Sequence, residues 1–124
     1  MSTLLLVAAG LTVLIATAHS FLGERYILIR LFRRDGLPKL LGGVEFTKQT
    51  LRFAWHITSL AWLGLAGVII VMASSEVVTR AALASVVSIT FGVTGLVALV
   101  ASRGRHLSWT VFFAIAGLVW AGGR

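Results

Sequence analysis

The 124-residue chain has no cysteine, which excludes disulfides, thiolate metal ligands and thiol catalysis. Charge is also scarce: charged residues make up 12% of the chain, whereas a soluble domain carries roughly 25%. Only four residues are acidic, which leaves little material for catalysis by paired carboxylates. The sequence shows no Gly-rich phosphate loop, no Ser–His–Asp pattern and no nucleic-acid-binding module. These absences favour a binding or structural role over an enzymatic one, and they argue against a nucleic-acid partner.

Hydrophobic residues, by contrast, make up 58% of the chain. They form four apolar runs at about residues 4–22, 53–73, 81–101 and 107–121. A bilayer core of about 30 Å needs roughly 20 helical residues, so the first three runs fit and the fourth is short. Ala16-Thr17-Ala18 looks like a signal-peptide cleavage site. Because no basic residue precedes the first apolar run, we interpret this run as a membrane span that is not cleaved off. We therefore predict an all-α fold: one domain, residues 1–124, forming a polytopic membrane protein with a four-transmembrane-helix bundle.

The basic residues indicate how such a bundle is oriented. The net charge is +7, and nine of the eleven basic residues lie in the connections between runs one and two and between runs three and four. These nine are Arg25, Arg30, Arg33, Arg34, Lys39, Lys48, Arg52, Arg103 and Arg105. Both connections fall on the same side of a four-span protein, and the positive-inside rule makes that side the cytoplasm. We expect a bacterial-type inner membrane location, both termini outside, and anionic lipid head groups at the basic side.

Two further patterns concern helix length and packing. An apolar helical pattern extends the first helix from Thr3 to Arg34, where Gly36 and Pro38 predict its end. Small residues at helical spacing predict close contacts between helices. They are Ala61 and Gly64 in the second run, Ala81, Ser85, Ser88, Gly92 and Gly95 in the third, and Ala114, Gly117 and Ala121 in the fourth. Four short helices with such surfaces also predict a homo-oligomer.

All three histidines fall at the predicted cytoplasmic side. His19 lies about one turn inside the first run, His56 about one turn inside the second, and His106 at the start of the fourth. Ionisable groups at membrane depth are costly and usually face the protein interior. Because runs one and two are joined by a connection, their polar stripes are expected to face each other. The candidate ligand-binding residues are His19, Glu24, Tyr26, Arg52, Trp55, His56 and Ser59, and the candidate metal ligands are His19, His56 and His106.

Several functions fit this set of residues. Imidazole suits transition metals, with Glu24 as a further ligand, and two histidines can also hold a haem between helices. Without a metal, the same cluster can hold a quinone or a lipid head group, or pass protons. Alternatively, the cluster only fixes the helices in a structural or partner-binding protein, and a small transporter is a weaker option. At 100° per residue Glu24 lies about 140° around the helix from His19, so we expect His19 to pair with His56 and Glu24 with an arginine.

The segments AHSFLGERYIL (18–28) and LRFAWHITSLAW (51–62) resemble motifs of small uncharacterised four-span bacterial membrane proteins. The resemblance covers roughly a fifth of the chain and implies no activity. It implies that six residues deserve testing: His19, Gly23, Glu24, Trp55, His56 and Ser59. A fainter similarity to small copper-resistance and cytochrome-b-like membrane domains rests on helix count and membrane histidines.

Overall fold

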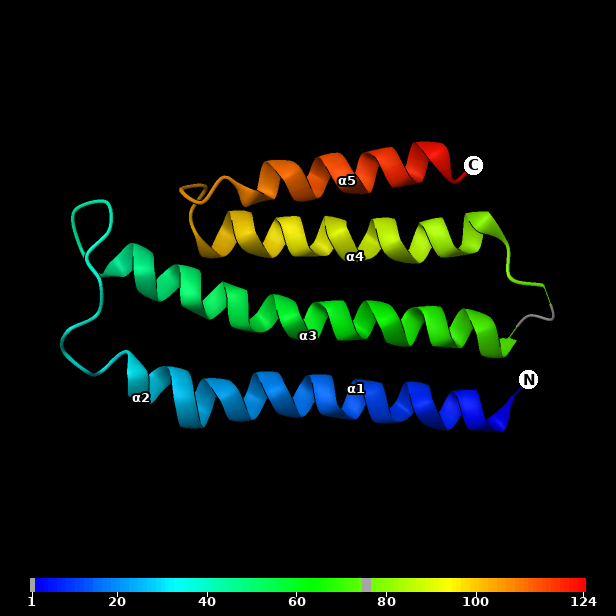
Figure 1. Cartoon of the computed structure of the whole chain (residues 1–124), viewed down its shortest axis with the longest axis horizontal. Helices are drawn as coiled ribbons and strands as arrows, with labels where there is room; N and C mark the ends of the chain where they lie inside the picture. The colour runs from blue at the N-terminus through cyan, green and yellow to red at the C-terminus, as the bar shows by residue number, and fades with distance from the viewer. Residues whose placement is uncertain (1, 75–76) are drawn as a thin grey trace.

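The structure is a computed structural model that describes residues 2–74 and 77–124, and every regular element in that part is a helix. The elements are α1 (Thr3–Gly23), the π-helical η1 (Glu24–Leu28), α2 (Ile29–Leu31), α3 (Glu45–Ser74), α4 (Arg80–Ala101) and α5 (Ser108–Gly122). Elements α1, η1 and α2 form one continuous rod (Figure 1). The predicted all-α class is confirmed. Three rods, Thr3–Leu31, α3 and α4, are long and apolar enough to cross a membrane, while α5 is shorter, with 15 residues.

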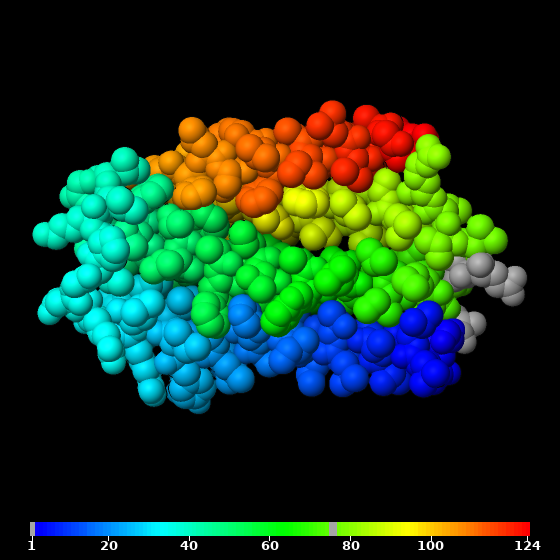
Figure 2. All heavy atoms as spheres, in the orientation of Figure 1, coloured from blue at the N-terminus to red at the C-terminus, as the bar shows by residue number. Residues whose placement is uncertain are grey.

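The four rods lie side by side in one row, in the order α1, α3, α4, α5 (Figure 1). Within the described residues, extensive contacts join only helices that follow each other in this row. Both termini lie at one end, and the α2–α3 connection and the α4–α5 turn lie at the other. Among the described residues the bundle is therefore open: each rod packs on the next in the row, and no core is shared by all four (Figure 2). Most buried apolar residues are alanines between neighbouring rods, and large apolar side chains such as Leu4 and Leu118 are exposed.

Small residues form the seam between α1 and α3. They recur every seven residues in both helices: Ala9, Ala16 and Gly23 in α1, and Ser59, Ala66 and Ala73 in α3, all buried. A seven-residue repeat keeps one face of a helix turned toward its partner, and small side chains let the backbones approach. The helices are antiparallel, and Ser2 N donates to Ala73 O at 3.2 Å where the start of α1 meets the end of α3. The seam fixes the register that positions the polar residues near Gly23.

The first rod ends three residues before the predicted end at Arg34. After Leu31 the chain closes with tighter bonds, from Arg33 N to Arg30 O at 3.3 Å and from Arg34 N to Leu31 O at 3.1 Å. Such i→i−3 bonds are common in the last turn of a helix and do not extend it. Gly36 then takes a positive φ of 90°, which ends the helical path as its position predicts.

The α4–α5 pair packs through part of the predicted face of α4 and through an unpredicted face of α5. On α4, Ala81 is exposed and nothing lies within 4 Å of a Cβ at Gly92, so the prediction was wrong for these two residues. Gly95 of α4 lies against Phe112 and Phe113, and Ser88 Oγ donates to Ala116 O at 2.7 Å, so these predicted contact residues are at the interface. On α5 the expected face was wrong: Ala114, Gly117 and Ala121 are exposed, and Ala116 is buried instead. The sequence misleads here because α5 is apolar all round, so its pattern does not mark the buried side.

Candidate functional site

A chain of hydrogen bonds between polar side chains crosses the seam of α1 and α3. His19 Nδ1 lies 3.0 Å from Ser59 Oγ, Ser59 Oγ lies 2.9 Å from Ser20 Oγ, and Ser20 Oγ lies 2.9 Å from His56 Nδ1. His19 and Ser20 come from α1, and His56 and Ser59 from α3. We call these four residues the histidine–serine chain. The predicted pairing of His19 with His56 thus takes the form of two imidazoles joined through two hydroxyls.

One end of the histidine–serine chain reaches an ion pair. His56 Nε2 lies 3.2 Å from Glu24 Oε2, and Arg52 Nη2 lies 2.9 Å from Glu24 Oε1. The Arg52 side chain is 48% exposed and that of Glu24 is 30% exposed. The expected pairing of Glu24 with an arginine is therefore present, and the carboxylate is only partly covered by the protein. Glu24 and His19 both contact α3, although they lie about 140° apart around an ideal helix.

The other end of the histidine–serine chain is held by aromatic rings. The His19 imidazole stacks on Trp55 with centroids 4.6 Å apart and planes 5° apart, and meets the edge of Trp62 at 5.0 Å. Trp55 Nε1 also donates to the backbone oxygen of His19 at 3.0 Å. Gly23 makes this arrangement possible, because a Cβ at that position would overlap the Trp55 indole. The ring of His19 is therefore fixed by both stacking and hydrogen bonding.

The helix changes type at this site. Glu24 is the first residue of the π-helical η1, where the Ile29 N–H bonds to the Glu24 carbonyl, five residues back. Short π-helical turns are rare in proteins, and those that do occur are often at functional sites. Sequence reasoning missed this turn, because the apolar pattern of the first rod continues through it without interruption and the segment contains no proline.

A shallow apolar groove lies beside the histidine–serine chain. It has a volume of about 330 Å3, near the lower end of the roughly 300–1,000 Å3 usual for small-molecule sites. Its lining comes from α1, η1 and α3: Ile15, Ala18, His19, Leu22, Gly23, Tyr26, Ile27, Trp55 and Trp62. We call this the aromatic groove. His19 is the member shared by the aromatic groove and the histidine–serine chain.

The seven candidate ligand-binding residues lie together around these features. His19, Tyr26 and Trp55 line the aromatic groove. Ser59 and His56 belong to the histidine–serine chain, and His56 contacts the ion pair of Glu24 and Arg52. Ser20 was missing from the candidate set, although its spacing of four from Glu24 places both on one helix face and gave a usable signal.

His106 lies in a different environment from the other two histidines. Its ring packs against Phe46 and Phe53, and its Nδ1 lies 2.9 Å from Ser108 Oγ. Within residues 2–74 and 77–124, no three His, Asp or Glu side chains are grouped as metal ligands. The structure thus gives no support to the three-histidine metal site or to Glu24 as a further ligand.

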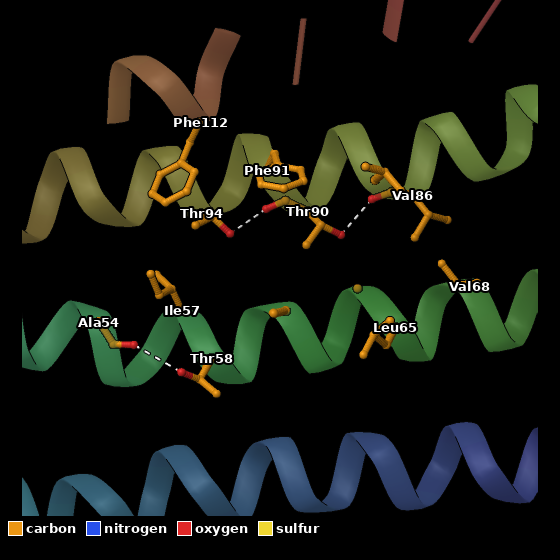
Figure 3. A pocket seen from close by; sticks show the side chains of 13 residues that line it. Ala54, Ile57, Thr58, Leu65, Val68, Val86, Thr90, Phe91, Thr94 and Phe112 are labelled. Atoms are coloured by element: carbon orange, nitrogen blue, oxygen red, sulfur yellow. Dashed lines mark hydrogen bonds between the residues drawn. The ribbon is translucent and has the colours of Figure 1, made fainter. Parts of the chain in front are cut away.

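A larger groove lies elsewhere, between α3 and α4 (Figure 3). Its volume is about 590 Å3, and its lining includes Leu65, Phe91 and Phe112. Its threonines already donate to carbonyls of their own helices: Thr58 to Ala54, Thr90 to Val86 and Thr94 to Thr90. This groove offers space for an acyl chain, but its three hydroxyls have no proton left to donate to a ligand, so we regard the aromatic groove as the better candidate.

Comparison of this chain with protein-family models, with curated proteins and with solved structures gave no match.

Proposed function

We propose that this protein is a small integral membrane protein that binds a lipid-like molecule with a planar ring, of the quinone type, in the aromatic groove. Supporting this is the position of His19, a polar group at the edge of an otherwise apolar groove with its ring held by Trp55 and Ser59. Apolar walls with one oriented polar group are typical of small-molecule sites. A ring carbonyl would accept a hydrogen bond from the imidazole, and the ring itself would pack on the indoles.

The proposed membrane placement puts all four rods across the bilayer, with the α2–α3 and α4–α5 connections of Figure 1 in the cytoplasm. It is supported by the apolar length of three rods and by the gathering of nine basic residues at the end opposite the termini. A polar groove of about 450 Å3 at that end is lined by Arg33, Arg34, Lys39 and Lys48, among others. Anionic lipid head groups are the expected occupants of such a surface.

Fluorescence quenching tests the ligand class. Trp55 and Trp62 line the aromatic groove, so a short-chain benzoquinone added to the protein in detergent should quench tryptophan emission with a saturable curve. His19→Leu should weaken the apparent affinity at least tenfold, because it removes the only imidazole in the groove. The matched control His106→Leu changes a histidine outside the groove and should leave the curve unchanged. Quenching that never saturates and is identical in all three proteins would disprove the proposal.

A structural role for the same residues is the second candidate. It is favoured by the histidine–serine chain itself, because its four members bond to one another across the contact between α1 and α3. Hydrogen bonds across membrane helices contribute about 0.6 kcal/mol each on average, which is enough to fix their register. In that case, His19→Leu would lower thermal stability while the benzoquinone would not bind the unaltered protein at all.

Self-association is a further proposal. One row of helices leaves large apolar side chains exposed on every rod, for example Leu11, Leu65, Ile89 and Leu118. A second copy packed on such a surface would bury it, as would lipid. We expect cross-linking in native membranes to trap a dimer or larger assembly, and a protein that stays monomeric in mild detergent and in membranes would refute this expectation.

A further inference from the structure

The histidine–serine chain links two different surfaces of the molecule. At one end, Arg52 lines a polar groove of about 440 Å3, together with Lys48, Gln49 and Arg103. At the other end, His19 lines the aromatic groove, whose surface is almost entirely apolar. Between them, every step from Arg52 to His19 is a contact of 2.9 to 3.2 Å. The bonds therefore form an unbroken path from water-exposed charge to the proposed ligand site.

Every member of the histidine–serine chain can both donate and accept a proton. A hydroxyl donates one hydrogen bond and accepts others, and a neutral imidazole donates from one nitrogen and accepts at the other. The whole chain can therefore run in either direction: the serines donate toward His19, or they donate toward His56. In the first direction His19 carries its proton on Nε2, and in the second it carries it on Nδ1.

His19 Nε2 is the ring nitrogen that the histidine–serine chain leaves unused. It makes no hydrogen bond to the described residues, and the buried side-chain atoms there that lack a partner are Gln49 Oε1 and Thr50 Oγ1. His19 Nε2 is thus open to the surface, and His19 belongs to the aromatic groove. The side chains that contact His19 are the uncharged Ser59, Trp55 and Trp62. His56, by contrast, faces Glu24 and, beyond it, Arg52.

We propose that the histidine–serine chain is a proton relay, which carries protons from Glu24 to an oxygen of the ring molecule in the aromatic groove. This inference rests on the function proposed above. In one passage, a hydronium ion protonates the exposed Glu24 carboxylate and Glu24 gives a proton to His56 Nε2. His56 then gives the proton of Nδ1 to Ser20. Ser20 passes its own proton to Ser59, and Ser59 passes its own to His19 Nδ1.

The passage ends when His19 gives the proton of Nε2 to a negatively charged oxygen of the ligand. One O–H bond breaks at Glu24 and one forms on the ligand, so one proton enters the path for each that leaves. The carboxylate left at Glu24 is stabilised by Arg52 at 2.9 Å. The hydroxyls and imidazoles then turn back to their first direction, and a second hydronium ion protonates the carboxylate for the next passage.

A coloured acid that resembles the proposed ligand tests the relay. A hydroxynaphthoquinone changes colour when its ring hydroxyl ionises, so it reports its own protonation. The dye would be bound as the anion and mixed rapidly with acid, and the rate of its protonation recorded. Ser20 does not line the aromatic groove, so Ser20→Ala should keep the dye affinity while slowing protonation at least tenfold. Ser20→Thr restores the hydroxyl and should restore the rate.

Each outcome of this experiment decides one claim. Equal affinity and equal rates in Ser20→Ala and the unaltered protein would overturn the relay and leave the proposed ligand site intact. A dye that does not bind the unaltered protein would overturn both. If Ser20→Ala fails to fold, the rate in heavy water decides with the unaltered protein alone. The relay predicts that protonation of the bound dye slows more in heavy water than protonation of the free dye in detergent, and an equal slowing would refute it.

Discussion

The two antiparallel helix pairs at the edges of the row are held together by different means. In the α1–α3 pair, small residues at seven-residue spacing bring the helices together, and a continuous polar path crosses their seam. In the α4–α5 pair, glycine and phenylalanine pack together, and Ser88 bonds to a backbone oxygen. Packing with one bond from a side chain to the backbone is therefore sufficient to join two of these helices. The additional polar groups in the α1–α3 pair call for another explanation, and the proposed ligand site provides one.

The largest difference between the pairs is expected at Gly23. Gly23→Leu would drive a branched side chain into the Trp55 indole, and overpacking of this kind costs about 3 kcal/mol. Gly117→Leu is the matched control in the other pair, because nothing lies within 4 Å of a Cβ at that position. Unfolding in mixed detergent micelles, followed by circular dichroism, would measure both. Equal stability of the two variants would contradict the close contact of α1 and α3.

Removal of one hydroxyl from each pair should give a smaller difference. Ser59 is buried and bonds to both Ser20 and His19, so Ser59→Ala should lower the free energy of unfolding by about 1.5 kcal/mol. Ser88→Ala removes one bond and should cost about 0.6 kcal/mol. The same unfolding measurement applies. A greater loss for Ser88→Ala would show that the polar path adds nothing to the α1–α3 contact.

The ion pair of Arg52 and Glu24 should contribute least to stability. Because both side chains are partly exposed, the coupling between them should be about 0.5 kcal/mol. Comparison of Glu24→Gln, Arg52→Gln and the double variant isolates this coupling. It should fall further when salt is added. A coupling that is large and independent of salt would mean that the pair is shielded from water. Protons could then not enter the proposed relay at Glu24.

The helices, their two ends and the facing polar stripes could be predicted, because each of them follows from a repeating pattern of residue types. Apolar runs and basic connections indicated the rods and their two ends, and the polar stripes at His19 and His56 indicated the neighbouring faces of α1 and α3. The single row of helices could not be predicted, because small residues mark a possible contact without naming the partner. This was clearest in α5, where Ala114 and Gly117 were expected at the interface and Ala116 occupies it.

The site was predictable only in part for a similar physical reason. The pairing of Glu24 with an arginine followed from charge, and the shared depth of His19 and His56 followed from their distance to the ends of the runs. Ser20 and Ser59 can bridge the two histidines only because the small residues between α1 and α3 fix how the helices align along their length. Hydrogen bonding needs an alignment accurate to less than about 1 Å, which the sequence pattern does not provide. The π-helical turn at Glu24 had no marker in the sequence, and His106 was separated from the others by its packing on Phe53.

Photo-labelling tests the central claim most directly. An azido derivative of a short-chain benzoquinone would be bound and illuminated, and the labelled peptides identified by mass spectrometry. If the ring occupies the aromatic groove, labels should fall on Trp55, Trp62 or Tyr26, and excess unmodified benzoquinone should prevent them. Labels concentrated on Phe91 and Phe112, in the larger groove between α3 and α4, would contradict the account.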